Sequence, residues 1–228
     1  RRAHARRDGT PRRGLEGLNV VGEMGTNFII VFNDNDQSIA ENHGGMYRKF
    51  KELRETNGTA EDNLFRAMGL DYRYVADGND CEALIAAFSA VRDSEKPVVV
   101  HIHTQKGKGY KFAEENRETW HYRMPFDMET GALKRPYTDP YQEATKAFLK
   151  EQTQTNPNIV FLAAGTMGAI GLSPKDRAEL GSQYVDVGIA EEHAVAMASG
   201  LARGGARPIF GTYSTFFQRV YDQMAQDV

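Results

Sequence analysis

The sequence predicts an α/β fold in which helices cover parallel β-sheets, and two observations carry this prediction. From Leu15 onward, apolar strand-like runs alternate with amphipathic helix-like runs, which is typical of parallel sheets with helical crossovers. The strand-like runs are continuously apolar, as in residues 28–32 (FIIVF), so they fit strands that are buried on both faces. The 228 residues are enough for two domains of this kind.

The first predicted domain covers residues 15–124. Its strands are residues 28–32, 97–104 and the first part of 70–80, and its helices are residues 44–58, 60–69 and 81–93. Asn57 and Gly58 should stop the first of these helices, because both residue types tolerate the backbone that ends helices. Residues 105–121 show no hydrophobic period, so we expect a long surface loop, a kind of segment that is usually functional in compact domains.

A second domain is predicted at residues 141–228, after a linker at residues 125–140 that has three prolines and no hydrophobic period. Its strands are residues 158–165, 184–188 and 208–214, and its helices are residues 141–152, 190–205 and 215–228. Residues 1–14 contain six arginines and are predicted to be a non-native or disordered arm.

Composition restricts the class of protein. The net charge of -3 gives no reason to expect nucleic acid or another polyanion as a partner. No apolar run is long enough to span a bilayer or resembles a signal peptide, and the single cysteine, Cys81, fits a reducing compartment. We therefore expect a cytoplasmic protein with no membrane partner, and we expect Cys81 to lie in the core of its domain.

Four loops at the ends of strands hold candidate functional residues, and the first follows residues 28–32. Parallel sheets bind ligands beyond the carboxyl ends of their strands, and amide and carboxylate oxygens suit a hard divalent cation. The side chain of Asn35 and the backbone carbonyl of Gln37 could therefore hold one Mg²⁺. A capped turn is the alternative interpretation of the same residues.

The second loop is TQKGKGY, in which two glycines allow a ligand close to the backbone and Lys106 and Lys108 could attract a phosphate. A solvated turn is the alternative. In the third loop, Glu191 opens a helix after Gly188, where the helix dipole favours a carboxylate for structural reasons alone.

The fourth loop contains Tyr213 and Phe216, which fit either a core or a ligand platform. Arg219, on the following helix, could pair with Asp222 or hold an anion. His101 and His103 point to one face of a strand but lack further ligands at suitable spacing, so we interpret them as polar residues near a loop, not as a zinc site. Taken singly, none of the four loops identifies a function.

Read together, the motifs resemble a known family. NDNDQSIAENHGG, DGND, HIHTQKGKGYKFAEE, DVGIAEEHAVAMASGLA and GTYSTFFQRVYDQ are similar, in this order, to motifs of the 1-deoxy-D-xylulose-5-phosphate synthases of the transketolase superfamily. The resemblance covers nearly all of residues 15–228. It implies a thiamine-diphosphate-binding fold, with an N-terminally incomplete diphosphate-binding domain at 15–124 and a truncated pyrimidine-binding domain at 141–228.

The resemblance also implies an activity and its cofactors. Enzymes of this family condense pyruvate with glyceraldehyde 3-phosphate and release CO₂, and their product serves isoprenoid and thiamine biosynthesis. The implied cofactors are thiamine diphosphate and Mg²⁺. The implied partners are these small molecules, together with a second copy of the chain or a complementary segment.

The implied roles follow the motifs residue by residue. Asn35 and Gln37 would bind Mg²⁺ and the cofactor. Glu191 would hydrogen-bond the aminopyrimidine ring, and His121 would face the reacting centre and the substrate. The remaining implied contacts are with the cofactor for Lys106, Ile189 and Phe216, and with the substrate for Tyr213 and Arg219.

The sequence also departs from the family pattern. A Gly-Asp-Gly stretch is expected near the start, but Arg7 replaces its first glycine, so Asp8 is at most a relic of a metal ligand. A shifted reading frame or a chimeric junction would explain residues 1–14. The short segment between Gly45 and Gly69 suggests a divergent branch, and we expect this chain to be a fragment that is inactive by itself. The alternatives are a transketolase-type subunit of a split enzyme and a non-catalytic binding protein that uses the arginine arm.

Overall fold

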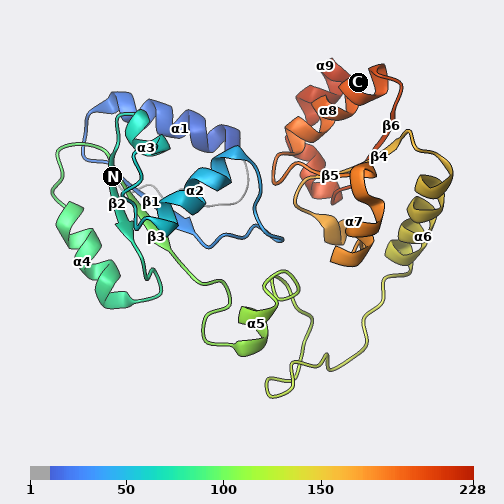
Figure 1. Ribbon diagram of the computed structural model, residues 1–228, viewed down its shortest axis with the longest axis horizontal. Helices are drawn as coiled ribbons and strands as arrows, with labels where there is room; N and C mark the ends of the chain where they lie inside the picture. The colour runs from blue at the N-terminus through green and yellow to red at the C-terminus, as the bar shows by residue number, and fades with distance from the viewer. Residues whose placement is uncertain (1–10) are drawn as a thin grey trace. The chain divides into compact units, whose positions relative to one another are not determined.

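A computed structural model describes residues 11–228, which form two compact units that meet in the sequence at Arg123 and Met124 (Figure 1). Each unit contains a three-stranded parallel sheet, which confirms the predicted α/β fold. Within the described residues, no helix combines the length and the hydropathy that crossing a membrane requires.

The sheet of the first unit has the strand order β1-β3-β2. Its strands are β1 (Ile29–Asp34), β2 (Asp71–Val75) and β3 (Val98–His103). Strand β1 is longer than predicted, because Asn33 and Asp34 still pair with β3. Asp34 is therefore a strand residue, on the same face as Ile30, and its side chain is fully buried.

Helices cover both faces of this sheet (Figure 1). Val21 of α1, Phe50 of α2 and Phe65 of α3 belong to one core cluster with Ile30 and Val99, whereas α4 packs on the opposite face. The helices of the unit are α1 (Pro11–Met24), α2 (Gly45–Glu55), α3 (Leu64–Ala67), α4 (Cys81–Val91) and α5 (Lys111–Glu115).

Several local predictions for the first unit need correction. The helix predicted at 60–69 begins only at Leu64, because the Asn63 side chain accepts hydrogen bonds from the N–H groups of Phe65 and Arg66 and so caps the helix. The predicted loop at 105–121 contains the short helix α5. Cys81 is exposed, since it opens α4, and the buried residues of that helix lie nearer its end.

The turn after α2 determines where the last side chains of this helix lie. As predicted, the helix stops at Asn57 and Gly58, which have φ angles of 49° and 79°. A Cβ atom on Gly58 would lie 2.5 Å from Cβ of Tyr74, so the turn packs tightly on β2. Arg54, in the last turn of α2, is held close to the sheet in consequence.

The second unit has the strand order β5-β4-β6. Its strands are β4 (Ile159–Ala163), β5 (Tyr184–Asp186) and β6 (Arg207–Phe210), and its helices are α6 (Pro140–Thr155), α7 (Pro174–Leu180), α8 (Glu191–Arg203) and α9 (Tyr221–Asp227). Helices α6 and α8 both pack against β4. The helix predicted at 215–228 is divided: a 3₁₀ helix at Ser214–Arg219 is followed by α9, and the fully buried Val220 lies between them.

The predicted arm and the predicted linker remain to be compared with the structure. Residues 1–10 of the predicted arm lie outside the described residues, and from Pro11 the chain is already helical, so the arm does not extend to residue 14 as a separate disordered segment. The predicted linker at 125–140 has no helix before Pro140, where α6 begins, and contains one isolated antiparallel bridge between Phe126 and Leu133.

Candidate active site

Hydrogen bonds join the loops at the carboxyl edge of the first sheet. Near the end of β1, the Asn33 side-chain oxygen accepts a hydrogen bond from the Thr104 hydroxyl at 2.6 Å. After β2, the Asn79 side-chain oxygen accepts one from the N–H of Gln105 at 2.7 Å. The end of β1 and the segment after β2 are therefore each fixed to the segment after β3 at this edge, where parallel sheets bind ligands.

The loop predicted to bind Mg²⁺ is a tight turn. Oδ1 of Asn35 accepts the N–H of Gln37 at 3.1 Å, and Asp36 between them has a φ of 64°. An amide oxygen has two lone pairs, so it can accept an N–H and also bind a cation. The described residues contain no group of three or more His, Cys, Asp or Glu side chains placed to hold a metal, and Asp8 lies outside the described residues. The loop itself offers amide and carbonyl oxygens, beside the carboxylates of Asp34 and Asp36, which pair with Arg54.

A buried charged network lies beside this loop and was not predicted from the sequence. Oδ2 of Asp34 lies 2.5 Å from Nη1 of Arg54 and 3.2 Å from Nε2 of His101. The other ring nitrogen of His101 lies 2.7 Å from the Tyr72 hydroxyl. His101 is fully buried among aromatic rings and is therefore not the loop-side polar residue that we predicted. The sequence did contain a signal for the burial of Asp34: side chains alternate along a strand, so Asp34 lies on the same face of the sheet as the buried Ile30.

Burial sets the protonation of this network. Burial lowers the pKa of His101 by more than its hydrogen bond to Asp34 raises it, so the imidazole is neutral at pH 7. Burial also raises the pKa of Tyr72, which therefore keeps its proton. We assign the hydrogen bonds accordingly: the Tyr72 hydroxyl donates to Nδ1 of His101, and Nε2–H of His101 donates to Asp34.

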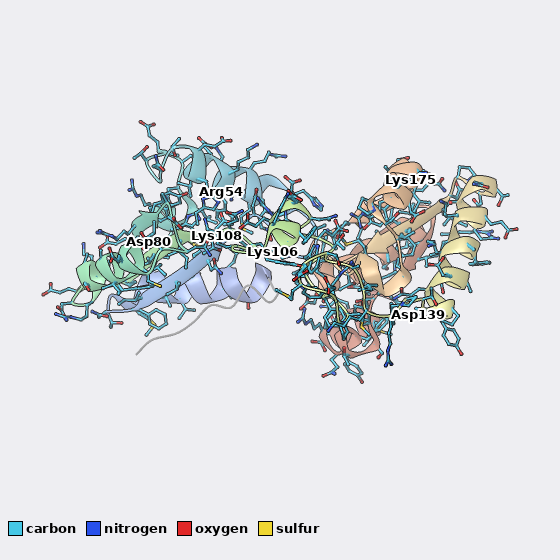
Figure 2. All side chains as sticks on the ribbon, turned by 90° about the horizontal axis from the view of Figure 1, so that it is seen from below. Arg54, Asp80, Lys106, Lys108, Asp139 and Lys175 are labelled. Carbon is cyan, nitrogen blue, oxygen red and sulfur yellow. The ribbon has the colours of Figure 1, made fainter. Side chains whose placement is uncertain are left out.

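Lys106 and His121 meet at the same edge of the sheet. Lys106 is labelled in Figure 2. Its Nζ lies 3.0 Å from Nδ1 of His121 and donates to the backbone carbonyl of Ser38 at 2.9 Å. The lysine thus ties the predicted phosphate loop to the predicted cation loop. Burial, and then the charge of Lys106, lower the pKa of His121, so this imidazole is neutral at pH 7 and can accept a proton.

We predict that Lys106→Met raises the pKa of His121. The substitution removes a positive charge beside the imidazole, but burial remains, so the pKa should approach its ordinary value from below without reaching it. An NMR titration of the His121 ring proton would measure the change. Lys108→Met, in the same loop, is the matched control and should leave the titration unchanged; equal curves for both variants would refute the assignment.

In the second unit, Glu191 is the central residue of the predicted site. It opens α8 and is fully buried. Its Oε1 accepts a hydrogen bond from Nη1 of Arg219 at 2.9 Å, whereas its Oε2 is buried and has no hydrogen-bond partner among the described residues. Arg219 thus pairs with Glu191, whereas one interpretation of the sequence paired it with Asp222. A buried carboxylate oxygen of this kind is a docking point for a ligand N–H.

Aromatic rings lie beside this pair. The Arg219 guanidinium lies 5.1 Å from the centre of the Phe216 ring, and the ring of Tyr213 is 5.9 Å from that of Phe216. Tyr213 precedes the 3₁₀ helix at Ser214–Arg219, and Phe216 and Arg219 lie on it three residues apart. Side chains at this spacing lie one above the other in a 3₁₀ helix. The structure thus brings Tyr213, Phe216 and Arg219 together with Glu191.

Asp186, at the end of β5, supports the loop that presents Glu191. Its Oδ1 accepts the N–H groups of Gly165 and Gly188, each at 2.9 Å. Gly165 has a φ of 70°, and a Cβ atom there would lie 2.9 Å from Cγ1 of Ile189. Ile189, which was predicted to contact the cofactor, therefore packs on the loop after β4. Asp186 was not predicted as a site residue from the sequence. The available signal was its position at a strand end, two residues before Gly188.

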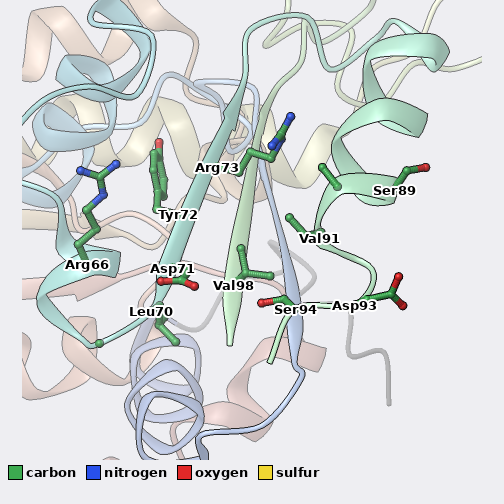
Figure 3. A pocket seen from close by; sticks show the side chains of 12 residues that line it. Arg66, Leu70, Asp71, Tyr72, Arg73, Ser89, Val91, Asp93, Ser94 and Val98 are labelled. Carbon is green, nitrogen blue, oxygen red and sulfur yellow. The ribbon is translucent and has the colours of Figure 1, made fainter. Parts of the chain in front are cut away.

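A groove of about 870 Å³ lies elsewhere in the first unit, where β2 and β3 begin (Figure 3). Leu70, Asp71 and Val98 line it at the amino ends of the strands. Arg66, one of the two arginines that line it, already lies 5.7 Å from the centre of the Tyr72 ring. None of the candidate residues lines this groove, so it is separate from the site at the carboxyl edge.

Comparisons with known proteins agree with this geometry. Residues 140–228 match the family described as the transketolase pyrimidine binding domain. Residues 9–62 and 53–104 match the family described as 1-deoxy-D-xylulose-5-phosphate synthase. The synthase family thus matches the first unit, and the pyrimidine binding family matches the second.

Similar proteins include several 1-deoxy-D-xylulose-5-phosphate synthases. Those of Clostridium acetobutylicum and Trichormus variabilis are 36% and 34% identical, each over 94% of this chain and 40% of their own length. The enzyme of Listeria monocytogenes is 35% identical over 94% of this chain and 36% of its own length. The chain thus spans about two fifths of these relatives.

Among solved structures, a transketolase from Leishmania mexicana is 15% identical, with a TM-score of 0.32, over 92% of this chain and 42% of the transketolase. A superposition this loose adds no weight, so the assignment rests on the sequence relatives and on the two matching families. On that basis, the chain belongs to the 1-deoxy-D-xylulose-5-phosphate synthase family of transketolase-like proteins.

Proposed function

We propose that this chain binds thiamine diphosphate and Mg²⁺ and contributes to the reaction of 1-deoxy-D-xylulose-5-phosphate synthases. In that reaction pyruvate and glyceraldehyde 3-phosphate give 1-deoxy-D-xylulose 5-phosphate and CO₂. One observation carries the proposal: the fully buried Glu191 has one oxygen paired with Arg219, and within residues 11–228 its other oxygen has no hydrogen-bond partner.

The unpaired oxygen of Glu191 suits the pyrimidine end of the cofactor. A buried polar atom without a partner costs about 1–3 kcal/mol, which a ligand N–H can recover. Arg219 holds Oε1, so Oε2 is the atom that would share a proton with a pyrimidine nitrogen. Phe216 and Tyr213 offer aromatic surface beside it. Thiamine diphosphate, when bound, supplies the stabilised carbanion that this class of reaction requires.

The carboxyl edge of the first sheet suits the diphosphate end. Asn35 and the Gln37 carbonyl would hold Mg²⁺, because amide and carbonyl oxygens are ligands that this ion accepts. Lys106 would hold a phosphate oxygen, and its contact with the Ser38 carbonyl keeps its ammonium group at the loop. The neutral His121 would face the reacting centre, where it can take up or return a proton.

The proposal extends to the compartment, the substrates and the association of the protein. We infer a cytoplasmic protein that acts on pyruvate and a phosphorylated aldehyde and that associates with a second copy or a complementary segment. The strands β1 and β2 are the edges of the described part of the first sheet. Edge strands offer unpaired backbone groups, which is a physical reason for association.

Calorimetric titration of the purified chain with thiamine diphosphate, with and without Mg²⁺, tests the proposal. We expect Mg²⁺-dependent binding that Asn35→Ala abolishes and Glu191→Ala weakens. Asn27→Ala, at the amino end of β1, and Glu192→Ala, next to Glu191, are the matched controls and should bind like the wild type. Absence of binding by the wild type at about 1 mM cofactor, where even a weak site would give heat, would exclude the proposal.

A further inference from the structure

One arginine holds the carboxylates on both sides of Asn35. Nη1 of Arg54 lies 2.5 Å from Oδ2 of Asp34, and Nη2 lies 2.5 Å from Oδ1 of Asp36. The guanidinium side chain is only 9% exposed, so these contacts are made largely out of water. Asp34, Asn35 and Asp36 are consecutive, and the two flanking residues are therefore fixed from one point.

The backbone of the loop depends on the same contacts. Asp36 adopts a left-handed conformation, with a φ of 64°, which a non-glycine residue keeps only when its surroundings hold it there. Its N–H donates to Oδ1 of Asp34 at 3.1 Å, and its carbonyl accepts the N–H of Asn42 at 3.2 Å. This turn directs the side chain of Asn35 and the backbone of Gln37.

We propose that Arg54 is a positioning residue for divalent-cation binding: by bridging Asp34 and Asp36 it holds Asn35 and the Gln37 carbonyl ready for the ion. This inference rests on the proposed function, because it assigns Asn35 and Gln37 as the ligands. It goes beyond that function, since Arg54 touches neither the ion nor the cofactor and lies on α2, outside the motifs that carry the family resemblance.

The chemistry of arginine explains why this residue suits the task. Two carboxylates two residues apart repel each other, and the attraction of both to a single positive charge between them offsets that repulsion. A guanidinium is a planar fork that reaches both carboxylates at once, whereas a lysine ammonium is a point charge on a flexible stem. Arg54→Lys therefore keeps the charge and the pairing with the buried Asp34 but loses the bridge.

The test is the affinity of the full chain for Mn²⁺, used in place of Mg²⁺, in the presence of thiamine diphosphate and measured by electron paramagnetic resonance. We expect Arg54→Lys to raise the Mn²⁺ dissociation constant about tenfold to a hundredfold, the usual effect of losing a group that orients metal ligands. Arg48→Lys, the same substitution on the exposed face of α2, is the matched control and should bind like the wild type.

Asp36→Asn supplies a second variant that should fold, because asparagine tolerates a left-handed backbone and the buried pair of Arg54 and Asp34 stays intact. It should weaken Mn²⁺ binding as well, and the double variant should bind no worse than Arg54→Lys, because both substitutions break one bridge. A purely structural role would not produce this non-additivity.

The outcomes separate the inference from the proposed function. If the wild type binds no Mn²⁺, the proposed function fails and this inference fails with it. If the wild type binds Mn²⁺ and Arg54→Lys equals Arg48→Lys, or if the effects of Arg54→Lys and Asp36→Asn add, only the role of Arg54 is overturned.

Discussion

Glu191→Gln is expected to slow the exchange of the thiazolium C2 proton of added thiamine diphosphate by about a hundredfold to ten-thousandfold, the range for loss of a positioned acid or base. Glutamine keeps the size of the side chain and its contact with Arg219, but an amide cannot share a proton with a pyrimidine nitrogen as a carboxylate does. Proton NMR of the cofactor in deuterated buffer, with the chain and Mg²⁺ present, measures the rate.

Glu192→Gln is the matched control for this experiment. Glu192 is the next residue of α8 and is only partly buried, and the substitution removes the same charge. Its exchange rate should stay within about twofold of the wild type, as is usual for a charge outside a site. Equal rates for Glu191→Gln and Glu192→Gln would mean that Glu191 does not act on the cofactor, even if the cofactor binds.

Asp34→Ala is expected to lower the free energy of unfolding of the first unit by about 3–5 kcal/mol, as is typical when one partner of a buried ion pair is removed. Asp34 is fully buried and accepts from Arg54, from His101 and from the N–H of Asp36. Its loss leaves these buried donors without their acceptor. Urea unfolding followed by fluorescence reports on this unit, because the single tryptophan of the chain, Trp120, belongs to it.

The control for Asp34→Ala is Asp93→Ala. Asp93 forms an ion pair with the neighbouring Arg92 at 2.9 Å, but both side chains are largely exposed. Exposed pairs of this kind contribute little to stability, so the unfolding midpoint should not move measurably. If Asp34→Ala unfolded at the same urea concentration as Asp93→Ala, the buried network would not stabilise the fold.

The sheets and most helices could be predicted from the sequence because their signals are local. Residues 28–32 are continuously apolar, and Asn57 with Gly58 marks the end of α2, so neither needs information from elsewhere in the chain. The break at Val220 could not be predicted in this way. That residue is no glycine or proline that would mark a break, and its full burial depends on packing that a local pattern does not encode.

The same distinction between local and long-range information applies to the candidate site. The predicted residues lie on loops at strand ends, and a parallel sheet brings such loops together without further information. The ion pairs, in contrast, join distant positions: Arg54 lies 20 residues from Asp34, and Arg219 lies 28 residues from Glu191. Which charges meet depends on how α2 and the 3₁₀ helix end, and these ends are set by packing and not by a motif.

The exposed position of Cys81 has a practical consequence. It is the sole cysteine of the chain and opens α4, shortly after Asn79, whose side chain holds the loop at the carboxyl edge of the first sheet. A nitroxide or a fluorophore can therefore be attached at this thiol without any prior substitution. With a second label on a cysteine introduced into the other unit, the same attachment point would report whether adding thiamine diphosphate and Mg²⁺ changes the distance between the two units.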